Sequence, residues 1–262
     1  MNIVKPASVA DAVSAAKAVA GSGGDVAYLA GGHTLIPAMK ARLRDPEQLV
    51  DLAALDDLRG IIEADGRLWM GAMTRHRDVA EQAGRIPALT EMALLIGDPQ
   101  VRNRGTLGGA LANNDPAADY PAAALALEAV IETDRASHAA ADFFQGMFFT
   151  ALEDGELIRR VGFRIPKRAA YAKFRHPASR YALSGVFVAE LDEGIWRVAV
   201  TGCGQEGVFR WPEAEEALAT GTDIASVTPP AASLMSSDIH ASAEYRAHLC
   251  TVMLAQAAQG LQ

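Results

Sequence analysis

Leu29-Ala30-Gly31-Gly32-His33-Thr34-Leu35-Ile36 is the stretch of sequence that decides the fold. Its two glycines lie where the short apolar run 26–30 gives way to a helical pattern over 36–44. Because glycine lacks a Cβ, the main-chain N–H groups of such a turn can approach an anion and point toward it. The stretch therefore predicts a pyrophosphate cradle, although an isolated Gly-Gly pair also fits an ordinary tight turn.

A second glycine loop, Gly105-Thr106-Leu107-Gly108-Gly109, precedes Asn114-Asp115-Pro116-Ala117-Ala118-Asp119. The two segments bring a hydroxyl, bare main chain and carboxylates close together in the sequence. Thr106 and the glycine amides suit phosphate oxygens, and Asp119 suits sugar hydroxyls. The alternative is that Asp115 or Asp119 only caps the helix that follows.

The remaining pattern indicates an α+β chain. We expect helices over 8–20, 79–82, 87–96, 117–127, 213–219 and 241–258, and strands over 26–30, 48–51 and 157–165. Asp65-Gly66 predicts a tight hairpin between 61–64 and 68–71. A second hairpin is expected between 183–191 and 196–202, with its turn at 192–194. Pro166, followed by Lys167-Arg168, marks the best domain boundary.

Composition excludes several classes of protein. The 262 residues carry a formal net charge of -8, which argues against a surface that binds nucleic acid. No apolar run approaches the roughly 20 residues of a membrane-spanning helix, so no integral membrane segment is expected. The first eight residues lack the pattern of a secretory signal, which favours a cytoplasmic protein. The two cysteines are too few for a four-ligand metal site, so any metal cluster is expected in a partner.

The glycine loops and two further segments together resemble a known family. The further segments are Tyr171-Ala172-Lys173-Phe174 with Pro177-Ala178-Ser179-Arg180-Tyr181-Ala182, and the tail Ser237-Asp238-Ile239-His240-Ala241-Ser242-Ala243-Glu244-Tyr245-Arg246. In this order and spacing they resemble the medium, FAD-binding subunit of carbon monoxide dehydrogenase and of the wider xanthine dehydrogenase family of molybdenum hydroxylases. The resemblance covers nearly the whole chain.

The resemblance implies a fold and a domain organisation. Residues 1–165 are expected to form a two-subdomain FAD-binding domain of the vanillyl-alcohol-oxidase (PCMH) type, with subdomains of about 1–56 and 57–165. Residues 166–262 are expected to form a C-terminal α+β domain with an antiparallel sheet and helices. The isoalloxazine ring of FAD is expected in the cleft between the two domains.

The resemblance also implies residue roles. Ala30 to Thr34 match the first diphosphate segment, flanked by Leu29, Leu35 and Ile36, whereas Thr106, Gly109 and Asp119 match the second. Ile96 and Tyr181 match positions against the ring, Ile158 matches a main-chain contact, and Lys173 matches a lysine near the polar edge of the flavin. The full set of expected FAD-binding residues is Leu29, Ala30, Gly31, Gly32, His33, Thr34, Leu35, Ile36, Ile96, Thr106, Gly108, Gly109, Asp115, Asp119, Ile158, Lys173 and Tyr181.

Two positions depart from the pattern of the family. Arg180 stands where an aspartate is common, which adds positive charge beside Tyr181. Ala110 lacks the asparagine amide that many relatives place after the second glycine pair. The histidines have no spacing typical of a metal site, so we expect surface or capping roles for His76, His138, His176, His240 and His248, and a non-covalent polar contact for His33.

A third glycine motif matches a dinucleotide-binding pattern, but its context argues against that function. Gly202-Cys203-Gly204-Gln205-Glu206-Gly207 satisfies G-x-G-x-x-G and follows an expected strand. A dinucleotide-binding motif of this kind must open a helix, but Val208-Phe209-Arg210-Trp211-Pro212 intervenes. We expect a strand end or turn here.

The resemblance implies an oxidoreductase subunit with no catalytic acid, base or nucleophile and no metal of its own. It would bind FAD non-covalently and pass electrons from a small [2Fe-2S] partner to a terminal acceptor. Molybdopterin would lie on a large partner, in a dimer of heterotrimers. Two alternatives stay open at this point: a self-contained FAD-dependent oxidase of the vanillyl-alcohol-oxidase type, and a structural partner module without FAD.

Overall fold

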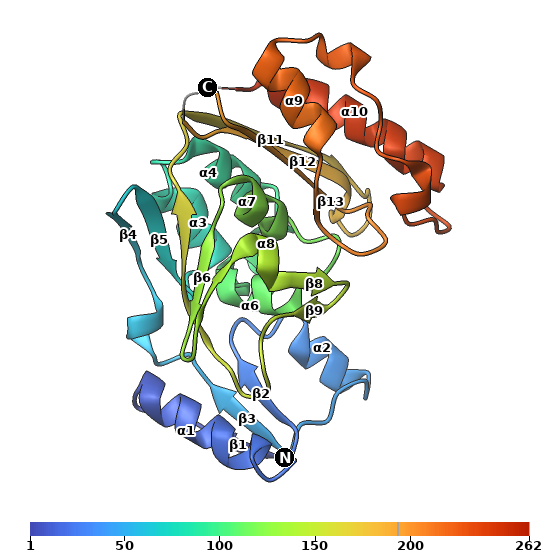
Figure 1. Cartoon of the computed structure of the whole chain (residues 1–262). Coiled ribbons are helices and arrows are strands. Elements are labelled where there is room, and N and C mark those ends of the chain that lie inside the picture. Colours follow the sequence, from blue (N-terminus) through green and yellow to red (C-terminus); the bar gives the residue numbers. More distant parts are fainter. Residues whose placement is uncertain (193, 262) are drawn as a thin grey trace.

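The structure, a computed structural model, describes residues 1–192 and 194–261. The turn expected at 192–194 includes Glu193, which lies outside the described residues. In the described residues, three sheets of three to five strands follow one another along the chain beside a small two-stranded sheet, and helices pack between and around them (Figure 1).

The first sheet is parallel and carries the first glycine loop at its edge. Its strands have the order β1-β3-β2 and comprise β1 (Asn2–Val4), β2 (Val26–Leu29) and β3 (Gln48–Asp51), with helices α1 (Val9–Ala20) and α2 (Leu35–Lys40). Ser8 caps α1, because its hydroxyl accepts the main-chain N–H of Asp11 at 3.1 Å. The first glycine loop connects the end of β2 directly to α2. The helix expected over 36–44 ends at Lys40, and Arg42 has a positive φ of 60°.

The second sheet has five antiparallel strands in the order β4-β5-β10-β6-β7. These are β4 (Ile61–Ala64), β5 (Arg67–Gly71), β6 (Val130–Thr133), β7 (Ser137–Ala139) and β10 (Ile158–Arg164). The predicted hairpin is confirmed, because Asp65 and Gly66 both have positive φ angles, of 52° and 70°.

Helices fill the connections within this second unit. They are α3 (His76–Gln82), α4 (Pro87–Leu94), α5 (Pro99–Arg104), α6 (Leu107–Asn113), α7 (Tyr120–Ala126) and α8 (Ala140–Phe143), followed by the small hairpin of β8 (Phe144–Gly146) and β9 (Phe149–Thr150). The helix expected from residue 117 begins only at Tyr120. The residues just before α7 are instead bound by another part of the chain. The hydroxyl of Thr201 donates to the carbonyls of Pro116 and Ala118, at 3.1 and 2.6 Å.

The third sheet is antiparallel and forms the upper layer in Figure 1. It comprises β11 (Arg168–Arg175), β12 (Ala182–Glu190), β13 (Trp196–Thr201) and β14 (Phe209–Arg210), with helices α9 (Pro212–Thr220) and α10 (Ala243–Gln259) on its outer face. The third glycine motif behaves as expected, because Gly202 to Gly207 lead into β14 and the next helix begins at Pro212.

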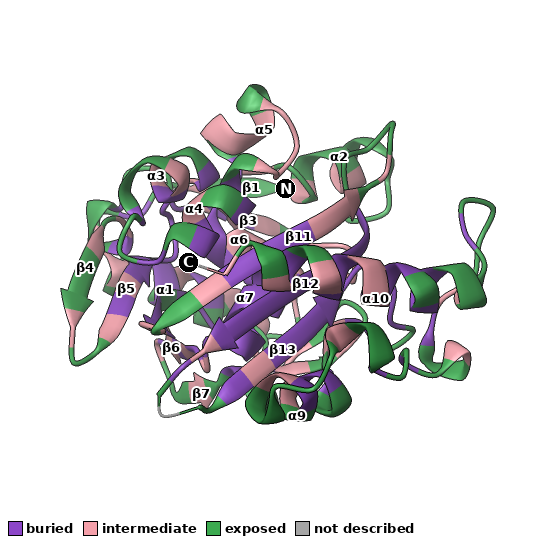
Figure 2. Ribbon diagram, turned by 90° about the horizontal axis from the view of Figure 1, so that it is seen from above, coloured by how far each residue is buried: buried purple, intermediate pink, exposed green. Residues whose placement is uncertain are grey.

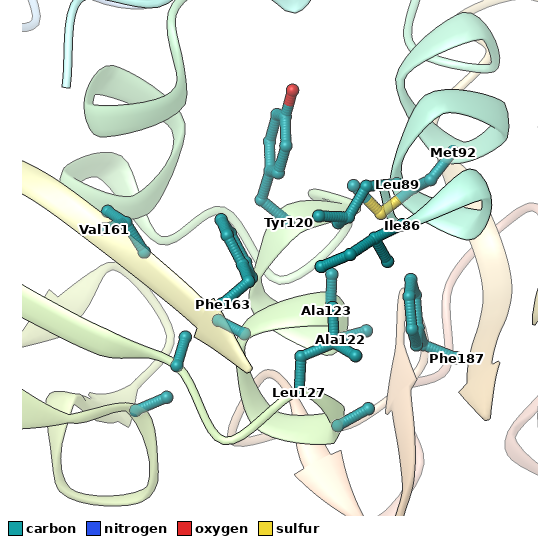
Figure 3. Packing of buried hydrophobic residues seen from close by; sticks show 14 of the residues in the cluster. Ile86, Leu89, Met92, Tyr120, Ala122, Ala123, Leu127, Val161, Phe163 and Phe187 are labelled. Carbon is teal, nitrogen blue, oxygen red and sulfur yellow. The ribbon is translucent and has the colours of Figure 1, made fainter. Parts of the chain in front are cut away.

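Strand β12 is buried along nearly its whole length (Figure 2). Its alternating side chains enter two different cores. Phe187 and Ala189 belong to the central core, which they share with α4 and α7, whereas Val186 and Val188 pack toward α10. Figure 3 shows the central core, in which Phe187 lies close to Ile86 and Ala122. Full burial of a side chain of this kind stabilises the fold by about 1.5–3 kcal/mol. The third sheet is therefore packed into the same core as the helices before it, while the domain boundary at residue 165 stays a prediction.

Two negative findings apply to the part of the chain that the structure describes. None of its helices is both long and apolar enough to cross a membrane. Within the same residues, no three histidine, cysteine, aspartate or glutamate side chains converge as a metal ion would require.

Candidate functional site

Both glycine loops and the third sheet border one cavity of about 490 Å³, a size typical of sites for small molecules and cofactors. The cavity brings together residues that lie far apart in the sequence. The expected FAD-binding residues that line it are Ala30, Gly31, Gly32, His33, Thr34, Leu35, Ile96, Thr106, Gly109, Asp115, Asp119, Lys173 and Tyr181.

The two glycine loops touch through Gly31. A Cβ at Gly31 would overlap the carbonyl oxygen of Arg104 and stand 2.9 Å from the Cα of Gly105. Glycine is required here by close approach, because the two main chains leave no space for a side chain. The loops therefore form one continuous wall of the cavity.

The first loop offers free hydrogen-bond donors. The main-chain N–H groups of Gly32, His33 and Thr34 donate to no other described residue of the protein. Gly32 has a positive φ of 75°, which turns the chain between strand and helix. Consecutive free N–H groups at such a turn are a common binding site for phosphate.

The second loop contributes differently from what the sequence predicted. Its glycine amides already have partners within the protein: Gly105 N–H donates to the Val101 carbonyl at 2.8 Å, Gly108 N–H to the Ala72 carbonyl at 2.8 Å, and Gly109 N–H to the Thr106 hydroxyl at 3.2 Å. The structure therefore gives no support to the expectation that these amides serve a phosphate, which stays a prediction. They build the start of α6, which Thr106 caps, so the loop contributes its close approach and the hydroxyl hydrogen of Thr106.

Asp119 is the centre of a buried polar cluster. Its carboxylate accepts from the Tyr171 hydroxyl at 2.5 Å and pairs with the Lys173 ammonium at 2.9 Å, both of which come from β11. Burial raises the pKa of the Asp119 carboxyl, and the charge of Lys173 and the hydrogen bond from Tyr171 offset part of that rise. The carboxylate is thus already engaged with side chains of the protein, and it holds Lys173 at the edge of the cavity.

Asp115 is the freer of the two carboxylates. One of its oxygens accepts the main-chain N–H of Ala117 at 2.8 Å, and the residue lines the cavity. Burial raises the pKa of the Asp115 carboxyl as well. Because its other oxygen has no partner among the described residues, Asp115 is better suited than Asp119 to accept bonds from sugar hydroxyls.

A loop from the third sheet closes one side of the cavity. It runs between β11 and β12 and carries Ser179, Arg180 and Tyr181 into the lining. Arg180 has a positive φ of 64°, and its guanidinium donates to the Gly97 carbonyl at 3.3 Å, next to Ile96. The departure at Arg180 therefore ties this loop to Gly97, which also lines the cavity.

Four of the expected residues lie outside the lining. Leu29 and Ile36 pack beneath the first turn, where a Cβ at Gly32 would meet the side chains of both. Gly108 is buried against Ala72, and Ile158 lies in the central core on β10. Their direct contact with a cofactor stays a prediction that the cavity itself does not support.

The sequence missed two buried residues of the cavity wall, His76 and Tyr120. A surface or capping role was expected for His76, but the structure buries it against the second glycine loop. This expectation was wrong because the burial depends on Gly105, which lies far from His76 in the sequence. Tyr28 and Arg44 also line the cavity and were not predicted.

Comparison with known proteins identifies the family. The family model described as FAD binding domain in molybdopterin dehydrogenase matches residues 1–168. The carbon monoxide dehydrogenase medium chain of Afipia carboxidovorans is 36% identical over 275 residues, which span 97% of this chain and 94% of that protein. The nicotine 6-hydroxylase medium subunit of Paenarthrobacter nicotinovorans is 33% identical over 261 residues, spanning 92% and 90%.

A solved structure agrees. Reconstituted CO dehydrogenase from Oligotropha carboxidovorans superposes with a TM-score of 0.85 at 34% identity, covering 99% of this chain and 96% of that one. The chain belongs to the FAD-binding family of the molybdopterin dehydrogenases, which are oxidoreductases, and FAD is the cofactor of this family. The resemblance read from the sequence and the predicted α+β class are confirmed.

The residues of the cavity fit FAD. Free N–H groups on the first loop suit the diphosphate, and residues of both loops line the cavity in which it would lie. Asp115 and Thr106 offer groups for sugar hydroxyls and phosphate oxygens, while Ile96 and Tyr181 offer apolar surface to a ring.

Proposed function

We propose that this chain binds one FAD non-covalently in the cavity and serves as the electron-transfer subunit of a heteromeric molybdenum hydroxylase. Electrons would pass from the [2Fe-2S] clusters of a small partner subunit to the flavin and on to a terminal acceptor. A large partner subunit would hold molybdopterin, in a dimer of heterotrimers. The observation that carries the proposal is the row of free N–H groups on residues 32–34, directly after Gly31, which contacts the second loop.

The residues of the chain bind and position the cofactor. When bound, FAD supplies the redox chemistry, which accepts and releases electrons singly or in pairs. The first loop holds its phosphates, Asp115 and Thr106 orient the adjoining groups, and Lys173 keeps a positive charge at the edge of the cavity. Lys173 cannot move freely, because Asp119 and the carbonyl of Leu95 both bind its ammonium.

An exposed apolar hairpin supports the proposal of a partner. Met147 and Phe148 join β8 to β9, whose first residue is Phe149, and the two phenylalanines are 56% and 71% exposed. The amide of Asn114 donates to the carbonyls of Gly146 and Phe149, each at 2.8 Å, and Asn114 directly precedes Asp115 of the cavity. Apolar side chains held outward beside a cofactor site are typical of a docking surface, and we assign this hairpin to the small partner.

The spectrum of the purified full chain tests the cofactor. We expect flavin absorbance that copurifies with the chain and is released by denaturation, since no covalent link is proposed. A chain that stays colourless after incubation with FAD would favour the module without FAD. Coexpression with an iron–sulfur chain and a molybdopterin chain tests the subunit role. A monomer that oxidises an alcohol by itself would favour the self-contained oxidase.

A further inference from the structure

His76 and Tyr120 form a pair that has no assigned role. His76 is the first residue of α3 and Tyr120 the first residue of α7, and their ring centroids lie 5.3 Å apart. Both residues line the cavity, yet they are only 6% and 1% exposed. Figure 3 shows the hydroxyl of Tyr120 pointing away from the apolar cluster.

Each of the two residues has a polar atom without a partner. Nδ1 of His76 and the hydroxyl of Tyr120 are buried and bind no other group of the described residues. A buried polar group without a hydrogen-bond partner destabilises the folded state. Two such atoms in adjacent rings at the wall of a cofactor cavity point to a bond that is completed only when the cavity is filled.

His76 lies directly behind the contact between the glycine loops. Its main-chain N–H donates to the Gly105 carbonyl at 3.0 Å, and a Cβ on Gly105 would overlap the imidazole at Nε2. Gly31 lies against Gly105 as well. A group bound over the loops would therefore meet the edge of the imidazole.

The imidazole is neutral at physiological pH. Burial lowers the pKa of His76 to about 4, and the nearby charges of His33 and Arg102 add to this effect. Burial raises the pKa of Tyr120, so its hydroxyl stays protonated. A neutral imidazole donates through one nitrogen and accepts through the other, and a tyrosine hydroxyl can satisfy the accepting nitrogen.

We infer that His76 and Tyr120 become a neutral hydrogen-bonding pair of the FAD site when the cavity is filled, since neither His76 Nδ1 nor the Tyr120 hydroxyl has a partner among the described residues. In the filled site, His76 presents an N–H group to the nucleotide beside the contact of the two loops. Tyr120 is a positioning residue whose hydroxyl then donates to the imidazole and fixes its tautomer and orientation. This inference rests on the proposed binding of FAD in this cavity, and it adds two residues to the site.

Titration of FAD into the full-length apoprotein, followed by flavin fluorescence, measures the contribution of each residue. We expect Tyr120→Phe and His76→Leu to weaken FAD binding about tenfold, which corresponds to about 1.4 kcal/mol. His76→Asn keeps an N–H donor and should stay within a few-fold of the unaltered chain. Tyr245→Phe is the matched control and should leave FAD affinity unaltered, because Tyr245 lies on α10, is 44% exposed and does not line the cavity.

A double variant separates positioning from general loosening of the fold. If Tyr120 acts through His76, Tyr120→Phe should have no further effect on FAD affinity in the His76→Leu background. The inference would be overturned if Tyr120→Phe weakened FAD binding equally in the unaltered chain and in the His76→Leu background. It would also be overturned if neither Tyr120→Phe nor His76→Leu changed the affinity for FAD. Should His76→Leu fail to fold, the pairing of Tyr120→Phe with His76→Asn gives the same comparison. Failure of the unaltered chain to bind FAD would instead refute the proposed function.

Discussion

Replacing Lys173 by methionine tests how the buried cluster at Asp119 supports the cavity. The two side chains are 1% and 5% exposed and lie 2.9 Å apart. Methionine fills similar space but removes the ammonium, which leaves the Asp119 carboxylate with the hydroxyl of Tyr171 as its remaining side-chain partner. Breaking a buried ion pair on one side costs about 3–5 kcal/mol, so we expect a loss of that order in the free energy of unfolding at pH 8.

The loss caused by Lys173→Met should depend on pH in a defined direction. Burial already raises the pKa of Asp119, and removing Lys173 removes the nearest charge that lowers it. A carboxyl whose pKa is higher in the folded state than in the unfolded state destabilises the fold as pH rises through that range. The deficit should therefore be largest at pH 8 and should shrink as pH falls toward about 4, the ordinary range of an aspartate.

Urea denaturation of the full chain without FAD, followed by circular dichroism, measures this loss. Asp119→Asn combined with Lys173→Met should recover most of it, because no unpaired charge is left. Lys40→Met, at an exposed position of α2, is the matched control and should change stability by less than about 0.5 kcal/mol. A cost of Lys173→Met below about 1 kcal/mol, equal at pH 5 and pH 8, would refute the buried pair.

Three further results are expected. Gly31→Ala would force the first loop away from the Arg104 carbonyl. FAD affinity should fall at least about tenfold in a fluorescence titration, and the free energy of unfolding should fall by about 1–3 kcal/mol. Gly84→Ala is the control, because a Cβ there meets no atom within 4 Å. The pKa of His76 is about 4 in the folded chain and 6.5 in its ordinary state, so the unfolded chain binds the proton first as pH falls. The free energy of unfolding should therefore decrease by up to about 3 kcal/mol as pH falls from 6.5 to about 4. His76→Asn should abolish that part of the pH profile, and an unchanged profile would contradict the assignment. Phe148→Asp should prevent copurification with the small partner while leaving FAD binding intact, and an intact complex would exclude the hairpin as the docking surface.

Local chemistry explains what could be predicted from the sequence. Ser8 caps its helix and Asp65-Gly66 turns its hairpin because the groups involved are neighbours in the chain. The glycine loops were predicted for the same reason, since the need for a bare main chain is visible in one short segment. The rejection of Gly202 to Gly207 as a dinucleotide motif also needed only the residues that follow it.

Contacts between distant segments explain what could not be predicted. Nothing near Asp119 indicates that Tyr171 and Lys173 will occupy its carboxylate, because that pairing depends on how β11 packs against the start of α7. The burial of His76 similarly depends on Gly105. Among the glycine amides of the second loop, only that of Gly108 has a distant partner, the carbonyl of Ala72, which the sequence near Gly108 does not indicate.

The contacts of Tyr171 and Lys173 on β11 with Asp119 have a consequence for chimaeric proteins. A hybrid that joins the first 168 residues of this chain to the third sheet of a relative would have to keep a tyrosine and a lysine at the positions of Tyr171 and Lys173. Without them, the transplanted sheet would cover a carboxylate that it cannot neutralise, and the graft would lose stability through a residue far from its seam. Recombination among relatives should therefore succeed most often where these two positions are inherited together with Asp119.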